Sequence, residues 1–264
     1  MHVAIAPASN KTSTAAISSL LSQNREIHVK GLYRDLKKVP NEFSSADNFE
    51  AIQGDVGDVN TLDFSGSDAV LMVLPPAYDG RDIIEHSQRI SKVLKNTDIP
   101  EIIIIRCSYF MENWTMSVET LKGSDPYFFS TITPLDFKIA MVAIKDIGAA
   151  MATQLIRDWT PPRKPYIMEL HGPEPYSPLD AQKAFSQALG EDVEVKAVEK
   201  EDLSEFYGKI FAPQIVNEWV EMSTCFLPGG IAEKDLSKPS DVDVIYGKTT
   251  LNEALREATA ELRK

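Results

Sequence analysis

The sequence predicts an α/β fold built on a doubly wound parallel sheet. Three observations carry this prediction. Short β-branched segments alternate with segments of helical periodicity, and residues 102–105 form an unbroken isoleucine run, as in a strand buried on both faces of a parallel sheet. Apolar residues make up 43% of the 264 residues and charged residues 25%, which are ordinary values for a folded globular protein.

Strands and helices follow in order along the chain. In the first part we expect strands over residues 2–6, 27–33, 50–53, 69–74 and 101–106, with helices over 12–21 and 84–94. Gly54-Asp55 ends the third strand and Pro75-Pro76 the fourth. From about residue 108 aromatic residues, prolines and longer loops become common. There we expect strands over 139–144, 166–170 and 193–198, with helices over 146–157, 201–222 and 251–262.

One further helix has both of its ends marked. Ser177 is a typical N-cap, Pro178 suits the first helical position, and Gly190 suits the end. The sequence therefore predicts a helix between Ser177 and Gly190.

Composition excludes several classes of function. The net charge is 27 − 39 = −12 and the basic residues form no cluster, so we expect no nucleic-acid partner. The two cysteines lie far apart and the four histidines are scattered, so the sequence gives no metal-binding motif. Cysteines without such a pairing pattern suit a reducing compartment. The N-terminus lacks a signal-peptide pattern and no segment is apolar enough to span a membrane, so we expect a cytoplasmic protein without a membrane partner.

The first strand-to-helix turn is where a doubly wound sheet usually binds a nucleotide phosphate. Here the turn consists of Pro7, Ala8, Ser9, Asn10, Lys11 and Thr12, and the chain has no glycine before Gly31. Asn10 tolerates a left-handed backbone, the hydroxyls of Ser9, Thr12 and Ser13 are donors, and Lys11 adds a positive charge. An ordinary capped helix start is the alternative interpretation.

The end of the second strand is where such a fold selects between cofactors. Arg34 stands there, supported by Lys37 and Lys38, and an arginine suits the 2′-phosphate of NADP(H). A surface ion pair between Arg34 and Asp35 is the alternative. The sequence thus predicts a Rossmann-like dinucleotide-binding domain over residues 1–137. A smaller substrate lobe follows over 138–264, part of which returns to the sheet.

These residues resemble the NmrA-like group of atypical short-chain dehydrogenases over nearly the whole chain. The motifs are Pro7 to Thr12, Tyr33-Arg34-Asp35, Gln53-Gly54-Asp55-Val56, Ser67-Asp68-Ala69-Val70, Arg106-Cys107-Ser108-Tyr109-Phe110-Met111-Glu112-Asn113, Asp146-Ile147-Gly148 and His171-Gly172-Pro173-Glu174. Together with Pro75-Pro76-Ala77-Tyr78-Asp79, the Tyr109–Asn113 stretch is similar to the fungal ergot-alkaloid (festuclavine and agroclavine) dehydrogenases. Those enzymes of fungal secondary metabolism reduce a cyclic iminium with NADPH.

The resemblance implies a role for each of these positions. The turn from Pro7 to Thr12 would line the pyrophosphate, and Arg34 would bind the 2′-phosphate. Asp55 and Val56 would lie near the adenine, and Leu74, Pro75 and Pro76 beside the ribose. Tyr109, Phe110 and Met111 would form the wall of the nicotinamide and substrate pocket. Ser13 stands where many relatives keep glycine.

One departure from the family concerns the middle of the sheet. Between Pro76 and Arg106 the family usually has a helix, a strand and a second helix, whereas this chain has one helical stretch over residues 82–95. Roughly thirty residues, the size of a strand–helix unit, are absent. The absent strand bears the catalytic serine in related dehydrogenases, and no Tyr-x-x-x-Lys element follows. Reduction of an iminium needs no proton donor, because that carbon is already positively charged.

Three functions remain open from the sequence. The first is an NADP(H)-dependent reductase of a small apolar, natural-product-like substrate, an iminium among the candidates, with Tyr109 and Tyr78 as catalytic residues. The second is a catalytically degenerate dinucleotide-binding or regulatory protein. The third is a non-redox cyclase or isomerase on the same scaffold. A sheet without an internal strand also exposes an edge, which leads to the hypothesis of a homodimer.

Overall fold

The computed structural model describes residues 1–23, 26–73, 99–233 and 242–262. These residues fall into two compact units. Unit 1 contains the described part of Met1–Pro75 together with Pro100–Ile105 and Ile144–Tyr166. Unit 2 contains Arg106–Ala143 and the described part of Ile167–Lys264. The division at residues 137 and 138 that the sequence suggests stays a prediction.

Unit 1 is built on a four-stranded parallel sheet. Its strands, in the order β3-β2-β1-β4, are β3 (Phe49–Gln53), β2 (His28–Tyr33), β1 (His2–Ala6) and β4 (Ala69–Met72). The chain runs outward from β1 to β3 and then returns to the other side of β1, which is the first half of a doubly wound sheet. All four strands end at the same edge. The predicted α/β fold with parallel strands is confirmed.

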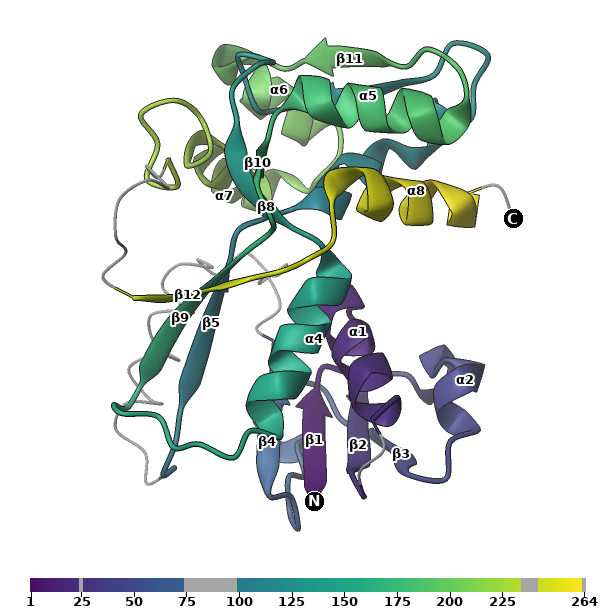
Figure 1. The fold of residues 1–264 in the computed structure, drawn as a ribbon. Coiled ribbons are helices and arrows are strands. Elements are labelled where there is room, and N and C mark those ends of the chain that lie inside the picture. The colour runs from purple at the N-terminus through teal and green to yellow at the C-terminus, as the bar shows by residue number, and fades with distance from the viewer. Residues whose placement is uncertain (24–25, 74–98, 234–241, 263–264) are drawn as a thin grey trace. The chain divides into compact units, whose positions relative to one another are not determined.

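Two helices cover one face of this sheet. Figure 1 shows α1 (Lys11–Leu21) and α4 (Ile144–Leu155) side by side, and Ile5, Ile17 and Leu20 are fully buried beneath them. Gly148 of α4 makes this close packing possible, because a Cβ there would lie 2.4 Å from the carbonyl carbon of Ala15. On the opposite face, partly buried side chains from residues 56–64 pack against Ala4, Ala6 and Leu32. Short helical elements connect the strands, namely η1 (Leu36–Lys38), α2 (Asn41–Ser44) and η2 (Val59–Thr61).

The isoleucine run does not continue the four-stranded sheet. It forms β5 (Ile103–Cys107), in a separate sheet of order β12-β9-β5 with β9 (Tyr166–His171) and β12 (Asp243–Tyr246). The prediction of burial on both faces is wrong: Ile103, Ile104 and Ile105 are only partly buried and Arg106 is exposed. Burial on both faces is typical of strands in a parallel sheet covered by helices on both sides, whereas among the described residues β5 is the edge strand of a separate three-stranded sheet.

The described sheet ends at β4, where a doubly wound sheet would add a further parallel strand. This is the place of the strand–helix unit that the sequence predicts to be absent. The predicted helix over residues 84–94 and the site candidates Leu74, Pro75, Pro76 and Tyr78 lie outside the described residues.

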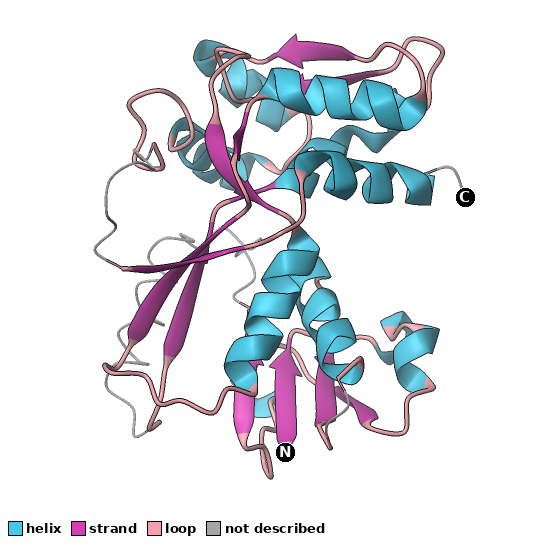
Figure 2. Cartoon of the chain, in the orientation of Figure 1, coloured by secondary structure: helices cyan, strands magenta, loops and turns pink. Residues whose placement is uncertain are grey.

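Unit 2 contains two small sheets and a helical layer. One sheet has the order β10-β8-β6 and the other pairs β11 with β7 in parallel. The strands are β6 (Tyr109–Phe110), β7 (Tyr127–Ser130), β8 (Ile139–Val142), β10 (Pro175–Tyr176) and β11 (Glu194–Ala197). Figure 2 shows α5 (Pro178–Leu189) and α8 (Leu251–Leu262) side by side. Phe128, Phe185 and Leu255 are fully buried in the core between these elements and η3 (Met111–Leu121).

The long helix predicted over residues 201–222 is wrong. The segment is broken into η4 (Lys200–Asp202), α6 (Leu203–Gly208), η5 (Pro213–Ile215) and α7 (Val216–Thr224). Pro213 lacks a backbone N–H and cannot continue a helix, so it begins a new turn as its first residue. Gly208 ends α6 five residues earlier.

Helix α5 begins as the sequence predicts. The Ser177 Oγ accepts a hydrogen bond from the Asp180 N–H (3.2 Å), and the Asp180 carboxylate accepts one from the Ser177 N–H (3.0 Å), which is a capping box. Gly190 ends the helix in the left-handed region with a φ of 76°.

We expect Ser177→Ala to lower the free energy of unfolding by about 1 kcal/mol, because it removes this cap from a buried helix start. Ser177→Thr keeps the hydroxyl and should retain most of the stability. Chemical denaturation of both variants would check this. Equal losses in the two variants would show that the hydroxyl does not cap the helix.

Candidate functional site

The predicted cofactor residues of unit 1 meet at the carboxyl edge of its sheet. The turn from Pro7 to Thr12 follows β1, Arg34 follows β2, and Asp55-Val56 follow β3. Hydrogen bonds join these segments: the Ala8 N–H donates to the Leu32 carbonyl (2.8 Å), and the Gly54 N–H donates to the Tyr33 carbonyl (3.0 Å). The structure therefore brings together positions that are far apart in the sequence.

Asn10 organises the turn, although not in the left-handed conformation that the sequence allowed. It is the N-cap of α1, with an extended backbone (φ −81°, ψ 159°). Its Oδ1 accepts hydrogen bonds from the Ser13 N–H and the Thr12 hydroxyl, both at 2.7 Å, and its Nδ2 donates to the Pro7 carbonyl. A capping side chain needs this extended backbone, so the turn requires no positive φ.

The turn fits an anionic group. Among the described residues, the N–H groups of Ser9, Asn10, Lys11 and Thr12 form no hydrogen bond. Unpaired N–H groups at a helix N-terminus favour a negative charge, and Lys11 is exposed beside them. The hydroxyls offer fewer free donors to an anion than expected, since the Thr12 hydroxyl donates its hydrogen bond to the Asn10 side chain. The Ser13 Oγ is buried and has no hydrogen-bond partner in the described part of the chain.

Arg34 is exposed, and no described carboxylate pairs with its guanidinium. Asp35, the predicted alternative partner, is instead the N-cap of η1 and accepts a hydrogen bond from the Lys37 N–H (3.0 Å). The Gln53 amide donates to the Arg34 carbonyl (3.5 Å), which ties the ends of β2 and β3 together. The guanidinium is thus accessible to an anionic ligand at the end of β2.

Asp55 is fixed by contacts within its own loop, and Val56 by packing against β1 and β2. The Asp55 carboxylate accepts a hydrogen bond from the Gly57 N–H (2.9 Å), and the Asp55 N–H donates to the Thr61 hydroxyl (2.8 Å). Val56 packs against the buried side chains of Ala4, Ala6 and Leu32. The role of these two residues near an adenine stays a prediction.

Tyr33, next to Arg34, is fully buried, and its hydroxyl has no hydrogen-bond partner among the described residues. Burial raises its pKa from 10.0 to about 12. The folded state holds the neutral form more strongly than the unfolded chain does. The stability that comes from this preference for the neutral hydroxyl is therefore complete below about pH 10 and is lost as the pH rises toward 12.

We expect Tyr33→Phe to raise the free energy of unfolding by about 1 kcal/mol at neutral pH, because it removes a buried hydroxyl that no described group pairs with. The variant should also lose less stability than the wild type above pH 10. Urea denaturation of both proteins at neutral and alkaline pH would check this. A parallel decline of the two proteins would assign the alkaline loss to other groups.

The predicted substrate-pocket residues lie in unit 2. Tyr109 is partly buried, and its ring contacts Trp114 and Phe226 with centroid distances of 5.8 and 5.1 Å. Burial raises the pKa of Tyr109, and the nearby Tyr207 adds to this, whereas a hydrogen bond with the Asn113 side chain works against it. The Tyr109 hydroxyl is therefore neutral near pH 7.

The two neighbours of Tyr109 are held differently. Phe110 is partly buried and lies opposite Val142 of β8. Met111 is fully buried in the core of unit 2, beside Trp114 and Phe128. A contact between these side chains and a ligand stays a prediction.

Other candidate chemistry is limited in the described part of the chain. No group of three His, Cys, Asp or Glu side chains could hold a metal ion there, and no helix is long and apolar enough to cross a membrane. Burial raises the pKa of Cys107 to about 11, which keeps the thiol protonated and unreactive.

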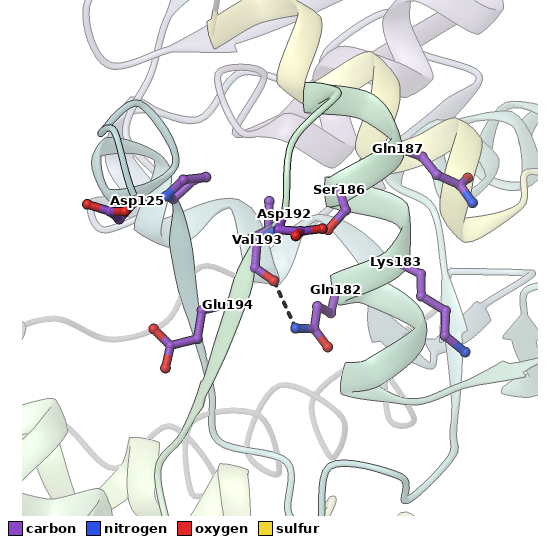
Figure 3. A pocket seen from close by; sticks show the side chains of 9 residues that line it. Asp125, Gln182, Lys183, Ser186, Gln187, Asp192, Val193 and Glu194 are labelled. Atoms are coloured by element: carbon purple, nitrogen blue, oxygen red, sulfur yellow. Dashed lines mark hydrogen bonds between the residues drawn. The ribbon is translucent and has the colours of Figure 1, made fainter.

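One hollow of about 750 Å³ lies in unit 2, lined by α5 and by the residues around the starts of β7 and β11 (Figure 3). The Gln182 amide donates to the Val193 carbonyl (2.8 Å) and the Ser186 hydroxyl accepts from the Val193 N–H (3.0 Å). These two hydrogen bonds fix the backbone of the segment that leads into β11. None of the predicted site residues that the structure describes lines this hollow.

No protein-family model matches the chain, and no curated protein sequence matches it. Solved structures do. Triphenylmethane reductase from Citrobacter sp. is 16% identical with a TM-score of 0.70, over 98% of this chain and 100% of that chain. Leucoanthocyanidin reductase from Vitis vinifera is 14% identical with a TM-score of 0.70, over 100% of both chains. The NADPH-dependent quinone oxidoreductase of Escherichia coli is 15% identical with a TM-score of 0.64, over 98% of this chain and 100% of that chain.

Each of these three proteins has also been solved in complex with NADP(H) or NADPH. The similarity extends over both units of this chain rather than over the four-stranded sheet alone. The chain therefore has the Rossmann-like α/β fold that these reductases share.

Proposed function

We propose that the protein is an NADP(H)-dependent reductase of a small, largely apolar substrate. One observation carries the proposal: the first N–H groups of α1 and the guanidinium of Arg34, which have no partner among the described residues, follow adjacent strands at one edge of the sheet. This is the edge where doubly wound sheets bind dinucleotides. The fold shared with reductases that bind NADPH supports the same assignment.

The roles of the residues follow from their chemistry. The N-terminus of α1, with Lys11, would hold the pyrophosphate, and Arg34 would bind the 2′-phosphate through charge-assisted hydrogen bonds. NADPH, when bound, supplies a hydride to an electron-poor carbon of the substrate. Where the product needs a proton, water supplies it. Tyr109 remains the candidate catalytic residue among the described residues, because its neutral hydroxyl is a donor that could polarise the acceptor.

The test is whether NADPH is consumed in proportion to product. The purified protein would be incubated with NADPH and, in turn, a quinone, a triphenylmethane dye and a cyclic iminium. We expect one product molecule for each NADPH oxidised with at least one acceptor class. Binding of NADPH without turnover of any acceptor would instead favour a regulatory dinucleotide-binding protein. Turnover without NADPH oxidation would favour a cyclase or isomerase.

A homodimer through β4 is a further part of the proposal. This strand is the edge of the described sheet, and Val70 and Met72 on it are 43% and 42% exposed. An edge strand with exposed apolar side chains can pair with a second copy of the chain. We therefore expect light scattering to give the dimer mass, and Val70→Lys to lower it. A monomer mass at every concentration would remove this part of the proposal.

A further inference from the structure

Two exposed histidines lie side by side at the amino edge of the four-stranded sheet. His2 begins β1 and His28 begins β2, and the two residues are direct partners in the register of these parallel strands. Their imidazole rings are stacked, with a centroid distance of 5.1 Å and an angle of 19° between the ring planes. The fold therefore holds together two imidazoles that are far apart in the sequence.

A carboxylate lies on the other side of His2. Asp68 directly precedes β4, the strand that pairs with β1. The Asp68 Oδ2 accepts a hydrogen bond from the His2 backbone N–H (2.7 Å) and is 3.9 Å from the His2 Nδ1. The Asp68 N–H in turn donates to the His2 carbonyl (2.9 Å). These backbone hydrogen bonds fix the carboxylate beside the Nδ1 edge of the ring, and the side chain of His2 is 63% exposed.

The surroundings leave ring nitrogens of both histidines available. Among the described residues, none is hydrogen-bonded to the Nε2 of His2 or to either ring nitrogen of His28. Lys30 follows His28 on the same face of β2, but its Nζ donates to the Ser65 carbonyl (3.0 Å). This edge of the sheet therefore offers two imidazoles and the negative charge of Asp68, which together suit a cation.

The chemistry of the ligands selects the kind of cation. Neutral imidazole is the commonest metal ligand in proteins, and it suits Cu²⁺, Ni²⁺ and Zn²⁺. Two nitrogens bound to one ion at about 2.0–2.1 Å lie roughly 3 Å apart, whereas the ring centres are 5.1 Å apart. Because both side chains are exposed, rotation of the rings can close this gap without moving the backbone. A carboxylate facing the other nitrogen of a ligand histidine fixes the orientation of its ring.

We propose that His2 and His28 form a two-imidazole site for a divalent transition-metal ion. Asp68 is a positioning residue, and water completes the coordination, since no group of three ligand side chains could hold a metal ion in the described part of the chain. The bound ion links β1 to β2 and so stabilises the folded sheet. The site lies at the amino edge, opposite the carboxyl edge that carries the proposed cofactor residues, so it does not depend on the proposed function.

The test is a calorimetric titration of the full chain, without a polyhistidine tag, with Ni²⁺ and separately with Ca²⁺. Ni²⁺ accepts imidazole, whereas Ca²⁺ takes oxygen ligands. The variants are His2→Gln, His28→Gln, the double variant and Asp68→Asn. Glu50→Gln is the matched control for Asp68→Asn, because it also removes one negative charge from an exposed position of the same sheet.

We expect the wild-type protein to bind Ni²⁺ more tightly than Ca²⁺ and to melt at a higher temperature when Ni²⁺ is present. Each single histidine variant should lose at least about 10-fold in Ni²⁺ affinity, and the double variant should lose little more, because both imidazoles hold one ion. Asp68→Asn should weaken binding less than either histidine variant, and Glu50→Gln should leave it unchanged. Electron paramagnetic resonance of the Cu²⁺ complex should show coupling to the nitrogens of two imidazoles.

Three results would overturn the inference. Equal affinity for Ca²⁺ and Ni²⁺ would assign the binding to surface charge alone. Losses of His2→Gln and His28→Gln that add up in the double variant would indicate two independent sites. A complex that survives His28→Gln would exclude a shared ion. The fate of the proposed function is read separately, because NADPH binding should be the same in the histidine variants as in the wild type.

Discussion

A Gly148→Ala variant is expected to unfold several degrees below the wild type and to bind a dinucleotide less tightly. The new Cβ would lie 2.4 Å from the carbonyl carbon and 2.5 Å from the Cβ of Ala15, and 2.6 Å from the Ala16 nitrogen. Two of these three atoms belong to the backbone, so α1 and α4 must move apart. Overpacking of this kind typically costs about 1–3 kcal/mol. The effect reaches the proposed site because α1 begins in the turn that would hold the pyrophosphate.

Differential scanning calorimetry would measure the change, with a shift of roughly 2–4 °C expected for each kcal/mol in a protein of this size. Gly208→Ala is the matched control: it also lies in a helix, but nothing is within 4 Å of its added Cβ. We expect the control to unfold at the wild-type temperature or above. A wild-type melting temperature for Gly148→Ala would show that the two helices are not in close contact.

Arg34→Ala is expected to weaken NADPH binding by about 10- to 100-fold and to leave NADH binding almost unchanged. The 2′-phosphate is the only group that distinguishes the two cofactors, and a charge-assisted hydrogen bond contributes about 1.5–3 kcal/mol. Arg34 has no described ion pair to lose, so the change should not alter the melting temperature of the free protein. Isothermal titration with both dinucleotides would measure the selectivity.

Two further variants sharpen this test. Arg34→Lys keeps the charge without the planar guanidinium, so we expect an intermediate loss of selectivity. Lys38→Ala removes a charge nearby, at the end of η1, and should cost much less than Arg34→Ala. If Lys38→Ala abolished the preference for NADPH and Arg34→Ala did not, the selector would be misassigned.

Much of the fold could be predicted because local signals and packing agree. The strands of the four-stranded sheet begin and end within one or two residues of their predicted limits. Gly54 marks the end of the third strand, and Pro75 marks the predicted end of the fourth. Ser177 and Gly190, which the sequence predicts to cap the helix α5, cap it in the structure. The burial of β5 could not be predicted, because it depends on which sheet the strand joins. The short strand β7 and the long η3 lack a period that would reveal them.

The candidate site could be predicted only in part, because some contacts depend on how distant segments pack together. Parallel strands end at one edge, so the turn after β1 and Arg34 after β2 were expected to meet. The contact between the Tyr207 and Ser223 hydroxyls was not visible in the sequence. In one continuous helix, Tyr207 and Ser223 would lie about 24 Å apart, at 1.5 Å per residue. The break at Pro213 brings their oxygens within 2.6 Å.

The central claim is that unit 1 binds NADP(H), and a thermal-shift titration tests it most directly. Wild-type protein would be heated with NADPH, NADP, NADH or NAD at increasing concentrations. We predict that NADPH and NADP stabilise the protein selectively, by about 2.7 kcal/mol at a hundred times the dissociation constant. The absence of a shift with all four dinucleotides, in a protein that melts cooperatively, would contradict the account.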